Sequence, residues 1–268
     1  MVGNSPVFVN DLEAFFELII DHDGLKKFIP EIDGHLSCNP TAAIEFLKIK
    51  KNLEEAVEIC MSTIQQTSAK WLVERKLRIT GSISYNLYTY ASNKNPDWNK
   101  KLSSIYNSTF KGNESTKYGL HAEKMCKEKY GLHCLLFECG LLISPDIPFL
   151  AVSPDGVAYN GDKWKLVEIK SPVKGKYISA KDLIKTLPYL ELSSKGIYEL
   201  KERHPYYGQM QLGLALTNLS CCDLVIFSSF NKSYETITVL KNVFFIEQYI
   251  KELMNIYFNY VMPFIFKK

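Results

Sequence analysis

The feature that most constrains the fold is a hairpin signal in the second half of the chain. Turn-forming residues occupy Tyr159-Asn160-Gly161-Asp162-Lys163, and a strand-like run, Trp164-Lys165-Leu166-Val167-Glu168-Ile169-Lys170, follows directly. Partner residues of an antiparallel pair have numbers with a constant sum. A two-residue loop at Gly161 and Asp162 sets that sum at 323.

The predicted hairpin places two carboxylates and a lysine on one face of the paired strands. In this register Asp155 lies directly opposite Glu168, and Lys170 shares the face because side chains alternate with period two. Two carboxylates so close repel each other, and a divalent cation relieves the repulsion. Oxygen ligands of this kind suit Mg²⁺, for which Mn²⁺ can substitute. The competing interpretation is a surface salt bridge between Glu168 and Lys170 beside an acidic turn.

The rest of the chain predicts a mixed α/β fold with strands clustered in the second half. Apolar spacing predicts helices over residues 10–20, 41–65, 66–76, 116–131, 205–218 and 244–260. Short branched or aromatic runs predict strands over residues 134–138, 149–152, 222–229 and 234–240. The helix at 205–218 is apolar nearly all round, so we expect it to be buried. The N-terminal quarter is expected to be entirely helical.

Composition and charge narrow the class of protein. The chain has 268 residues, 46% hydrophobic and 23% charged, as in ordinary soluble proteins. The apolar run at 15–20 is too short for a signal peptide or a membrane span, so we expect an intracellular protein without a membrane partner. Seven cysteines without a CxxC pair predict reduced thiols. Lysines gather between Lys163 and Lys185, as a solvated face or as a phosphate-binding strip.

Two segments carry a resemblance to a known family. Ser153-Pro154-Asp155-Gly156 and Val167-Glu168-Ile169-Lys170-Ser171-Pro172 resemble the lambda exonuclease group, in particular the YqaJ-type viral recombinase nucleases with a PD-(D/E)xK core. The resemblance runs from about Trp71 to Phe258. It implies a restriction-endonuclease-like domain over residues 66–268, with a mixed central β-sheet flanked by helices. Residues 1–65 have no counterpart in the family and form a predicted helical N-terminal extension.

The resemblance also assigns catalytic and metal-binding roles. It places Asp155, Glu168 and Lys170 at the catalytic centre and makes the backbone carbonyl of Ile169 a further metal ligand. Tyr118-Gly119-Leu120-His121-Ala122-Glu123 matches a family helix, so Glu123 would be another metal-site carboxylate. The residue pattern agrees, because Leu120, Glu123, Cys126 and Tyr130 share one helical sector; a surface glutamate is the alternative. His204-Pro205-Tyr206-Tyr207-Gly208-Gln209-Met210-Gln211 resembles the helix whose glutamine, here Gln209, lines the active site, and amides satisfied by neighbours are the alternative.

Further residues correspond to phosphate contacts of the family. Arg75-Lys76-Leu77-Arg78-Ile79-Thr80-Gly81-Ser82 is similar to its Arg-rich segment, with Arg75 and Ser82 at contacting positions and Arg78 assisting. Ser153 and Lys176 also fall on phosphate-contacting positions. Guanidinium and hydroxyl groups suit phosphate oxygens. A basic helix end capped by polar residues is the competing explanation for the first segment.

The function implied by the resemblance is hydrolysis of DNA phosphodiester bonds with Mg²⁺. We expect a 5′-to-3′ exonuclease whose partner is double-stranded DNA with free ends, and an assembly of identical chains is left open. The alternatives are a structure-selective endonuclease and a catalytically inert DNA-binding protein that assists recombination. A small-molecule hydrolase or a structural α/β protein would leave the ordered motifs without an explanation.

Overall fold

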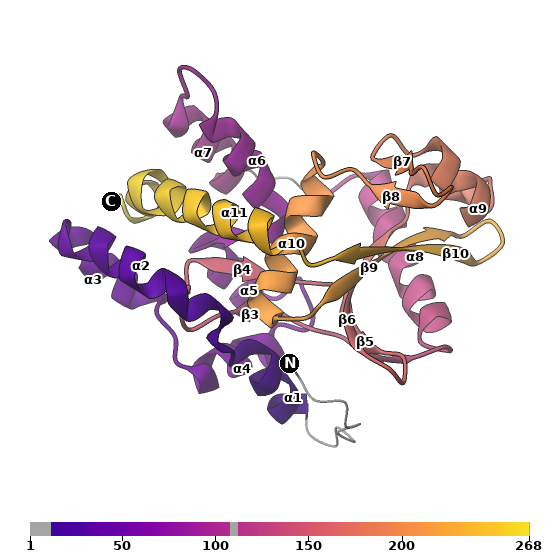
Figure 1. Cartoon of the computed structure of the whole chain (residues 1–268), viewed down its shortest axis with the longest axis horizontal. Helices are drawn as coiled ribbons and strands as arrows, with labels where there is room; N and C mark the ends of the chain where they lie inside the picture. The colour runs from indigo at the N-terminus through magenta and orange to yellow at the C-terminus, as the bar shows by residue number, and fades with distance from the viewer. Residues whose placement is uncertain (1–11, 108–111, 268) are drawn as a thin grey trace.

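The core of the fold is a five-stranded mixed sheet. The computed structural model describes residues 12–107 and 112–267 (Figure 1). The strand order is β10-β9-β6-β5-β2. The bounds are Leu135–Phe137 for β2, Gly156–Tyr159 for β5, Trp164–Lys170 for β6, Cys221–Ser228 for β9 and Ser233–Leu240 for β10. Within this sheet β6 and β9 are the parallel pair, and the other neighbouring strands pair in antiparallel fashion. The predicted mixed sheet is confirmed.

The hairpin of β5 and β6 has the predicted register. Gly156 pairs with Val167 and Tyr159 pairs with Trp164, so the partner numbers add to 323. The connection is longer than the predicted two-residue loop, because residues 160–163 lie between the last paired positions. Gly161 has a φ of 90°, a conformation that costs glycine little. The even number of connecting residues keeps Asp155 and Glu168 on one face.

Two helices cover the faces of the sheet. Helix α8, Glu114–Tyr130, buries Ala122 and Cys126 against Val167 and Val225 on one face. Helix α10, Pro205–Thr217, contacts β6 and β9 on the other face and is buried nearly all round, as predicted. Figure 1 shows these helices on either side of β6 and β9. Helix α11, Val243–Ile256, runs on through a π-helical turn, Tyr257–Val261, into α12, Met262–Phe266.

Two smaller sheets and several helices complete the chain. Strands β1 (Ile79–Thr80), β4 (Leu150–Val152) and β3 (Leu142–Ile143) form one sheet, and β7 (Leu190–Leu192) pairs with β8 (Tyr198–Leu200) in another. Helices α6 (Gly81–Ala91), α7 (Trp98–Tyr106) and α9 (Ala180–Leu183) were not predicted. In α6 the apolar residues are separated by serine, threonine and asparagine, so their helical spacing is weak.

The N-terminal part is helical, as predicted, but its segmentation differs. Its elements are α1 (Leu12–Ile20), η1 (Asp23–Phe28), α2 (Ile29–Ser37), α3 (Pro40–Ile49) and α4 (Leu53–Ser62). The single helix predicted over 41–65 is wrong, because Asn52 caps a new helix through a reciprocal capping box with Glu55. Helix α5 spans Ala69–Lys76. Residues 10 and 11 of the first predicted helix lie outside the described residues.

The N-terminal helices share a hydrophobic core with the sheet. The ring of Phe15 lies 4.4 Å from that of Trp164, centroid to centroid, at the start of β6. His22 Nε2 donates to the carbonyl of Leu216 in α10 at 3.1 Å. The extension is therefore packed against the domain, and its boundary at residue 65 stays a prediction. No helix within the described residues is long and apolar enough to cross a membrane.

Candidate active site

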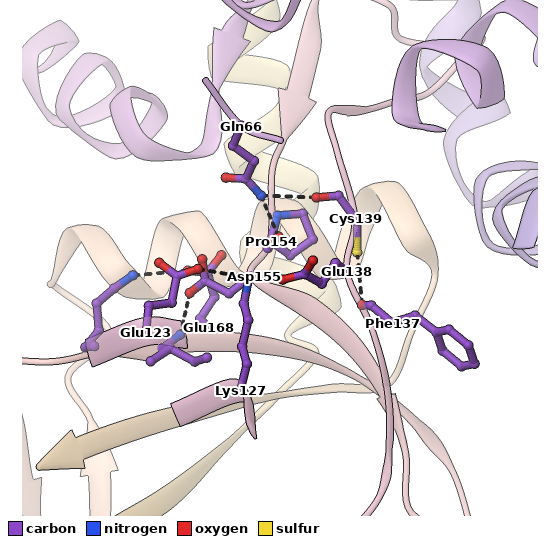
Figure 2. A network of polar contacts seen from close by, with 11 residues as sticks. Gln66, Glu123, Lys127, Phe137, Glu138, Cys139, Pro154, Asp155 and Glu168 are labelled. Atoms are coloured by element: carbon purple, nitrogen blue, oxygen red, sulfur yellow. Dashed lines mark hydrogen bonds and ion pairs between the residues drawn. The ribbon is translucent and has the colours of Figure 1, made fainter. Parts of the chain in front are cut away.

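The structure brings Asp155, Glu168 and Lys170 together at the hairpin, as predicted. Asp155 directly precedes β5, and its Oδ2 accepts a hydrogen bond from the backbone N–H of Ile169 at 2.6 Å. Glu168 is 5% exposed, and its Oε2 accepts a hydrogen bond from Lys170 Nζ at 3.1 Å. Figure 2 shows the carboxylates of Asp155 and Glu168 turned toward one another. The cluster therefore holds buried negative charge.

Burial and mutual repulsion shape the protonation of this cluster. Burial and the negative charge of Glu168 raise the pKa of Asp155 to about 7. Burial lowers the pKa of Lys170, but the charges of Glu168 and Asp155 outweigh burial and raise that pKa above its ordinary value. Lys170 Nζ also lies 4.9 Å from the ring centroid of Tyr206. Lys170 is therefore an ammonium at neutral pH.

Glu123 stands beside these carboxylates on α8, where a second lysine engages it. Lys127 Nζ lies 2.9 Å from Glu123 Oε1 and 2.9 Å from Glu138 Oε1. The Glu123 side chain is 29% exposed, and its charge contributes to the raised pKa of Asp155. Figure 2 shows Lys127 between the two glutamates. Sequence reasoning missed Lys127, although an (i, i+4) Glu–Lys pair was a visible signal.

The predicted apolar sector around Glu123 is only partly present. Cys126 and Tyr130 are buried, as expected. Leu120 is 61% exposed and does not join them, so that expectation was wrong. Most side chains in the N-terminal half of α8 are exposed, although Tyr118 still packs against the cluster that holds Cys126 and Tyr130.

The backbone of Ile169 faces the same cluster. Its N–H points to Asp155, and in an extended strand the N–H and C=O of one residue point to the same side. The carbonyl that was predicted to bind metal therefore faces the side where β5 has ended. Within residues 12–107 and 112–267, no group of three or more His, Cys, Asp or Glu side chains is arranged to hold a metal ion. Asp155, Glu168 and Glu123 are instead engaged by Ile169 N–H, Lys170 and Lys127.

A glutamine from the N-terminal region supports the segment that carries Asp155. Gln66 Nε2 donates to the carbonyl of Pro154 at 3.0 Å and to the carbonyl of Cys139 at 3.1 Å (Figure 2). Pro154 precedes Asp155, and Cys139 follows Glu138. The amide therefore ties together two segments that border the acidic cluster. No local pattern in the sequence singled out Gln66.

Three of the predicted phosphate-binding residues form a second group around Trp71. Arg75 Nη2 donates to Ser82 Oγ at 3.1 Å, and its guanidinium lies 4.1 Å from the ring centroid of Trp71. Trp71 Nε1 donates to Ser153 Oγ at 3.0 Å. Ser82 lies in the first turn of α6, where the helix N-terminus favours anions. Trp71 is a functional candidate that was not identified from the sequence.

Arg78 does not join this group. Its side chain is fully buried, and its guanidinium donates to the carbonyls of Pro148, Glu74 and Ile49 and pairs with the Glu74 carboxylate. The expectation that Arg78 assists in phosphate contact is therefore not supported, because protein oxygens occupy its donors. Burial lowers its pKa, and the charge of Glu74 opposes that shift. Arg78 therefore connects the end of α5 to the segments that carry Ile49 and Pro148.

The predicted lysine strip is only partly on the surface. Lys165 and Lys170 turn inward to Asp223 and Glu168. Lys176 is exposed, and its Nζ lies 4.6 Å from the ring centroid of Tyr118 on α8. Lys176 thus remains available to a phosphate near the N-terminal half of α8.

The two glutamines of α10 have different environments. Gln211 is buried, accepts from the N–H of Asn242 at 2.8 Å and donates to the carbonyl of Leu240 at 2.7 Å, so it connects α10 to the junction between β10 and α11. Gln209 is half-buried, and a Cβ added at Gly81 would meet its Cγ at 3.2 Å. Its amide makes no hydrogen bond to the described part of the chain. The structure therefore places Gln209 beside the start of α6, and its catalytic role stays a prediction.

A mixed sheet whose hairpin carries this Asp, Glu and Lys has the architecture of the PD-(D/E)xK class. Residues 70–220 match the YqaJ-like viral recombinase domain family. The match spans more than half of the chain, so the chain belongs to this family.

Solved structures with a similar fold have low sequence identity. An alkaline exonuclease, LHK-Exo from Laribacter hongkongensis, has a TM-score of 0.55 at 20% identity, covering 74% of this chain and 95% of that chain. LHK-Exo in complex with dAMP has a TM-score of 0.53 at 20% identity, covering 70% and 90%. A SOX–DNA complex has a TM-score of 0.50 at 12% identity, covering 78% and 72%. At these identities the likeness is one of fold. No curated protein matches the chain.

Proposed function

We propose that this protein is a Mg²⁺-dependent deoxyribonuclease that degrades double-stranded DNA from free ends in the 5′-to-3′ direction. Family membership and the exonuclease fold support a nuclease acting on DNA. The observation that carries the proposal is the close placement of Asp155 and Glu168, beside Lys170, at the end of the β5–β6 hairpin. Similar structures described as an alkaline exonuclease and as a DNA complex are consistent with a nuclease that acts on DNA.

The donor chemistry of the cluster fits a hard divalent cation. Asp155, Glu168 and Glu123 would supply carboxylate oxygens and Ile169 its carbonyl oxygen, which are ligand types of Mg²⁺ and of Mn²⁺ as a substitute. Burial and the charge of Glu168 raise the pKa of Asp155, so a cation beside this carboxylate would favour its ionised form. When bound, the cation would stabilise charge on the phosphate and activate water. Lys127 holds Glu123 Oε1 and would therefore compete with the cation for this carboxylate.

The surrounding side chains have separable tasks in this proposal. Lys170 stays charged, so it donates to a phosphate oxygen or orients water and does not act as a proton acceptor. The N–H of Ile169 holds the Asp155 carboxylate in place. Arg75, Ser82 and Ser153 would bind a DNA phosphate, with Lys176 contacting the backbone elsewhere. Gln209 would add an amide donor near the same phosphate.

The experiment compares substrates that differ in their ends. Purified protein is incubated with linear duplexes carrying a 5′ or a 3′ label and with circular DNA, in Mg²⁺ or in EDTA. The proposal expects Mg²⁺-dependent release of nucleotides from 5′ ends and intact circles. Cleavage of circles would favour a structure-selective endonuclease, and binding without cleavage would favour an inert recombination-accessory protein. Asp155→Asn is the inactive control.

A further inference from the structure

A cavity of about 440 Å³ lies beside the acidic cluster. Glu123, Ile169 and Lys170 form part of its lining, so the cavity adjoins the proposed catalytic centre. The remaining lining is mostly apolar or aromatic and includes Leu120, Pro172, Leu187, Tyr189 and Tyr206. Its volume is near the lower end of the range for small-ligand pockets. The cavity therefore suits one nucleotide rather than a base pair.

Two residues that line this cavity have buried hydroxyls without a hydrogen-bond partner. Within the described residues, the buried side-chain polar atoms without a partner are the hydroxyls of Ser171, Tyr189 and Tyr249. Ser171 and Tyr189 both line the cavity, and Tyr189 is 9% exposed. A buried hydroxyl without a partner costs stability, so such groups are rare in folded proteins. Two such groups, in residues that line the same cavity, point to hydroxyls that pair with a bound ligand.

The wall that carries Tyr189 is built from packed aromatic rings and is linked to the catalytic lysine. Tyr206 meets Tyr189 edge to face, with centroids 5.1 Å apart, and His204 lies 5.1 Å from Tyr189. Lys170 Nζ lies over the ring of Tyr206, so the same aromatic group borders both the cavity and the reacting centre. Leu120 remains 61% exposed at the cavity and offers apolar surface to a ligand.

We propose that this cavity is the subsite for the nucleoside of the nucleotide whose phosphate is held at the acidic cluster, with the hydroxyls of Tyr189 and Ser171 as its hydrogen-bonding groups. The proposal rests on the proposed nuclease function. A nucleobase has apolar faces that pack on apolar and aromatic side chains and an edge that needs hydrogen bonds. A hydroxyl both donates and accepts, so the pair serves all four bases and gives weak sequence preference.

The test uses the four deoxynucleoside monophosphates as probes. Their affinities for the full chain are measured by isothermal titration calorimetry in Ca²⁺, for wild type, Tyr189→Phe and Ser171→Ala. Each variant should bind all four nucleotides on the order of 3- to 10-fold more weakly, the loss expected for one hydrogen bond. Tyr177→Phe is the matched control, because Tyr177 is 70% exposed. It should bind as wild type does.

Thermal unfolding without nucleotide separates a ligand role from a structural role. If the hydroxyls lack internal partners, Tyr189→Phe and Ser171→Ala should melt at or above the wild-type temperature. Wild-type nucleotide affinity in both variants would overturn the proposal. The proposal would also be overturned if the wild-type protein bound inorganic phosphate as tightly as it binds the nucleotides, because the nucleoside would then contribute nothing to the affinity. Failure of the wild type to cleave DNA with Mg²⁺ refutes the nuclease, whereas unchanged affinities in the two variants refute the subsite.

Discussion

Asp155→Asn should stabilise the metal-free protein while abolishing cleavage. The substitution removes a charge that burial and Glu168 disfavour, as the raised pKa of Asp155 shows. The amide oxygen of the substituted side chain can still accept the hydrogen bond from Ile169 N–H. The same charge that costs stability in the free protein is the charge that a cation needs. Stability and activity are therefore expected to change in opposite directions.

The magnitude follows from the pKa. A rise from 3.8 to about 7 corresponds to about 4 kcal/mol between the two protonation states. Because Asp155 is half-buried, water relaxes around its carboxylate, and we expect about 1–3 kcal/mol. Since the folded pKa is raised, the wild type loses stability as pH rises from about 4, where the unfolded chain ionises, to about 7. The gain in the free energy of unfolding of Asp155→Asn over the wild type is therefore small below pH 4 and fully present above pH 7.

The assay is urea unfolding in EDTA at pH 4, 6 and 8, followed by the same series in Mg²⁺. Mg²⁺ should stabilise the wild type more than the variant, because it binds the folded site. Asp182→Asn is the control. Its carboxylate is exposed, and the hydrogen bond from Lys185 lowers its pKa, so its removal should not stabilise at pH 8. Equal free energies of unfolding for Asp155→Asn and the wild type at pH 8 would refute the reasoning. A stabilisation by Asp155→Asn that is larger at pH 4 than at pH 8 would refute it too.

Three further predictions test the remaining assignments. Glu168→Ala and Lys170→Ala should each lower the cleavage rate on the order of 10² or more while retaining the wild-type circular dichroism spectrum; near wild-type turnover would remove that residue from the site. Lys127→Met should tighten the apparent Mg²⁺ affinity in a cleavage titration and Glu123→Gln should weaken it, because Lys127 competes with the cation for Glu123. Lys124→Met, at an exposed position, is the control. An unchanged affinity in both variants would mean that Glu123 does not bind the metal. Arg75→Ala should weaken DNA binding and reduce its salt dependence in a fluorescence anisotropy titration. Arg78→Ala should instead destabilise the fold by about 3–5 kcal/mol in urea unfolding, since it leaves Glu74 without its buried partner, and reversal of the two phenotypes would contradict the assignment.

The sequence by itself determined the elements whose signals are local. Strand alternation and the Asn-Gly-Asp turn predicted the hairpin register that sets Asp155 against Glu168. The uninterrupted apolar character of residues 205–218 predicted a buried helix. The break at Asn52 was missed although its capping box with Glu55 stands in the sequence, because helical spacing continues across it. The short pairing of β7 with β8 lacked enough alternation to be predicted.

Only the tertiary structure decided which polar side chains lie at the candidate site. Arg75 and Arg78 belong to one basic segment, yet one stacks on Trp71 beside Ser82 and the other is enclosed by the carbonyls of Ile49 and Pro148. Gln66 and Trp71 reach partners more than 70 residues away, and Tyr189 comes to the cavity beside Glu123 from a separate part of the chain. A local pattern gives the periodicity of a segment, whereas these contacts depend on how distant segments pack. Packing also decides which charged side chains are buried, as Arg78 is, and which stay accessible.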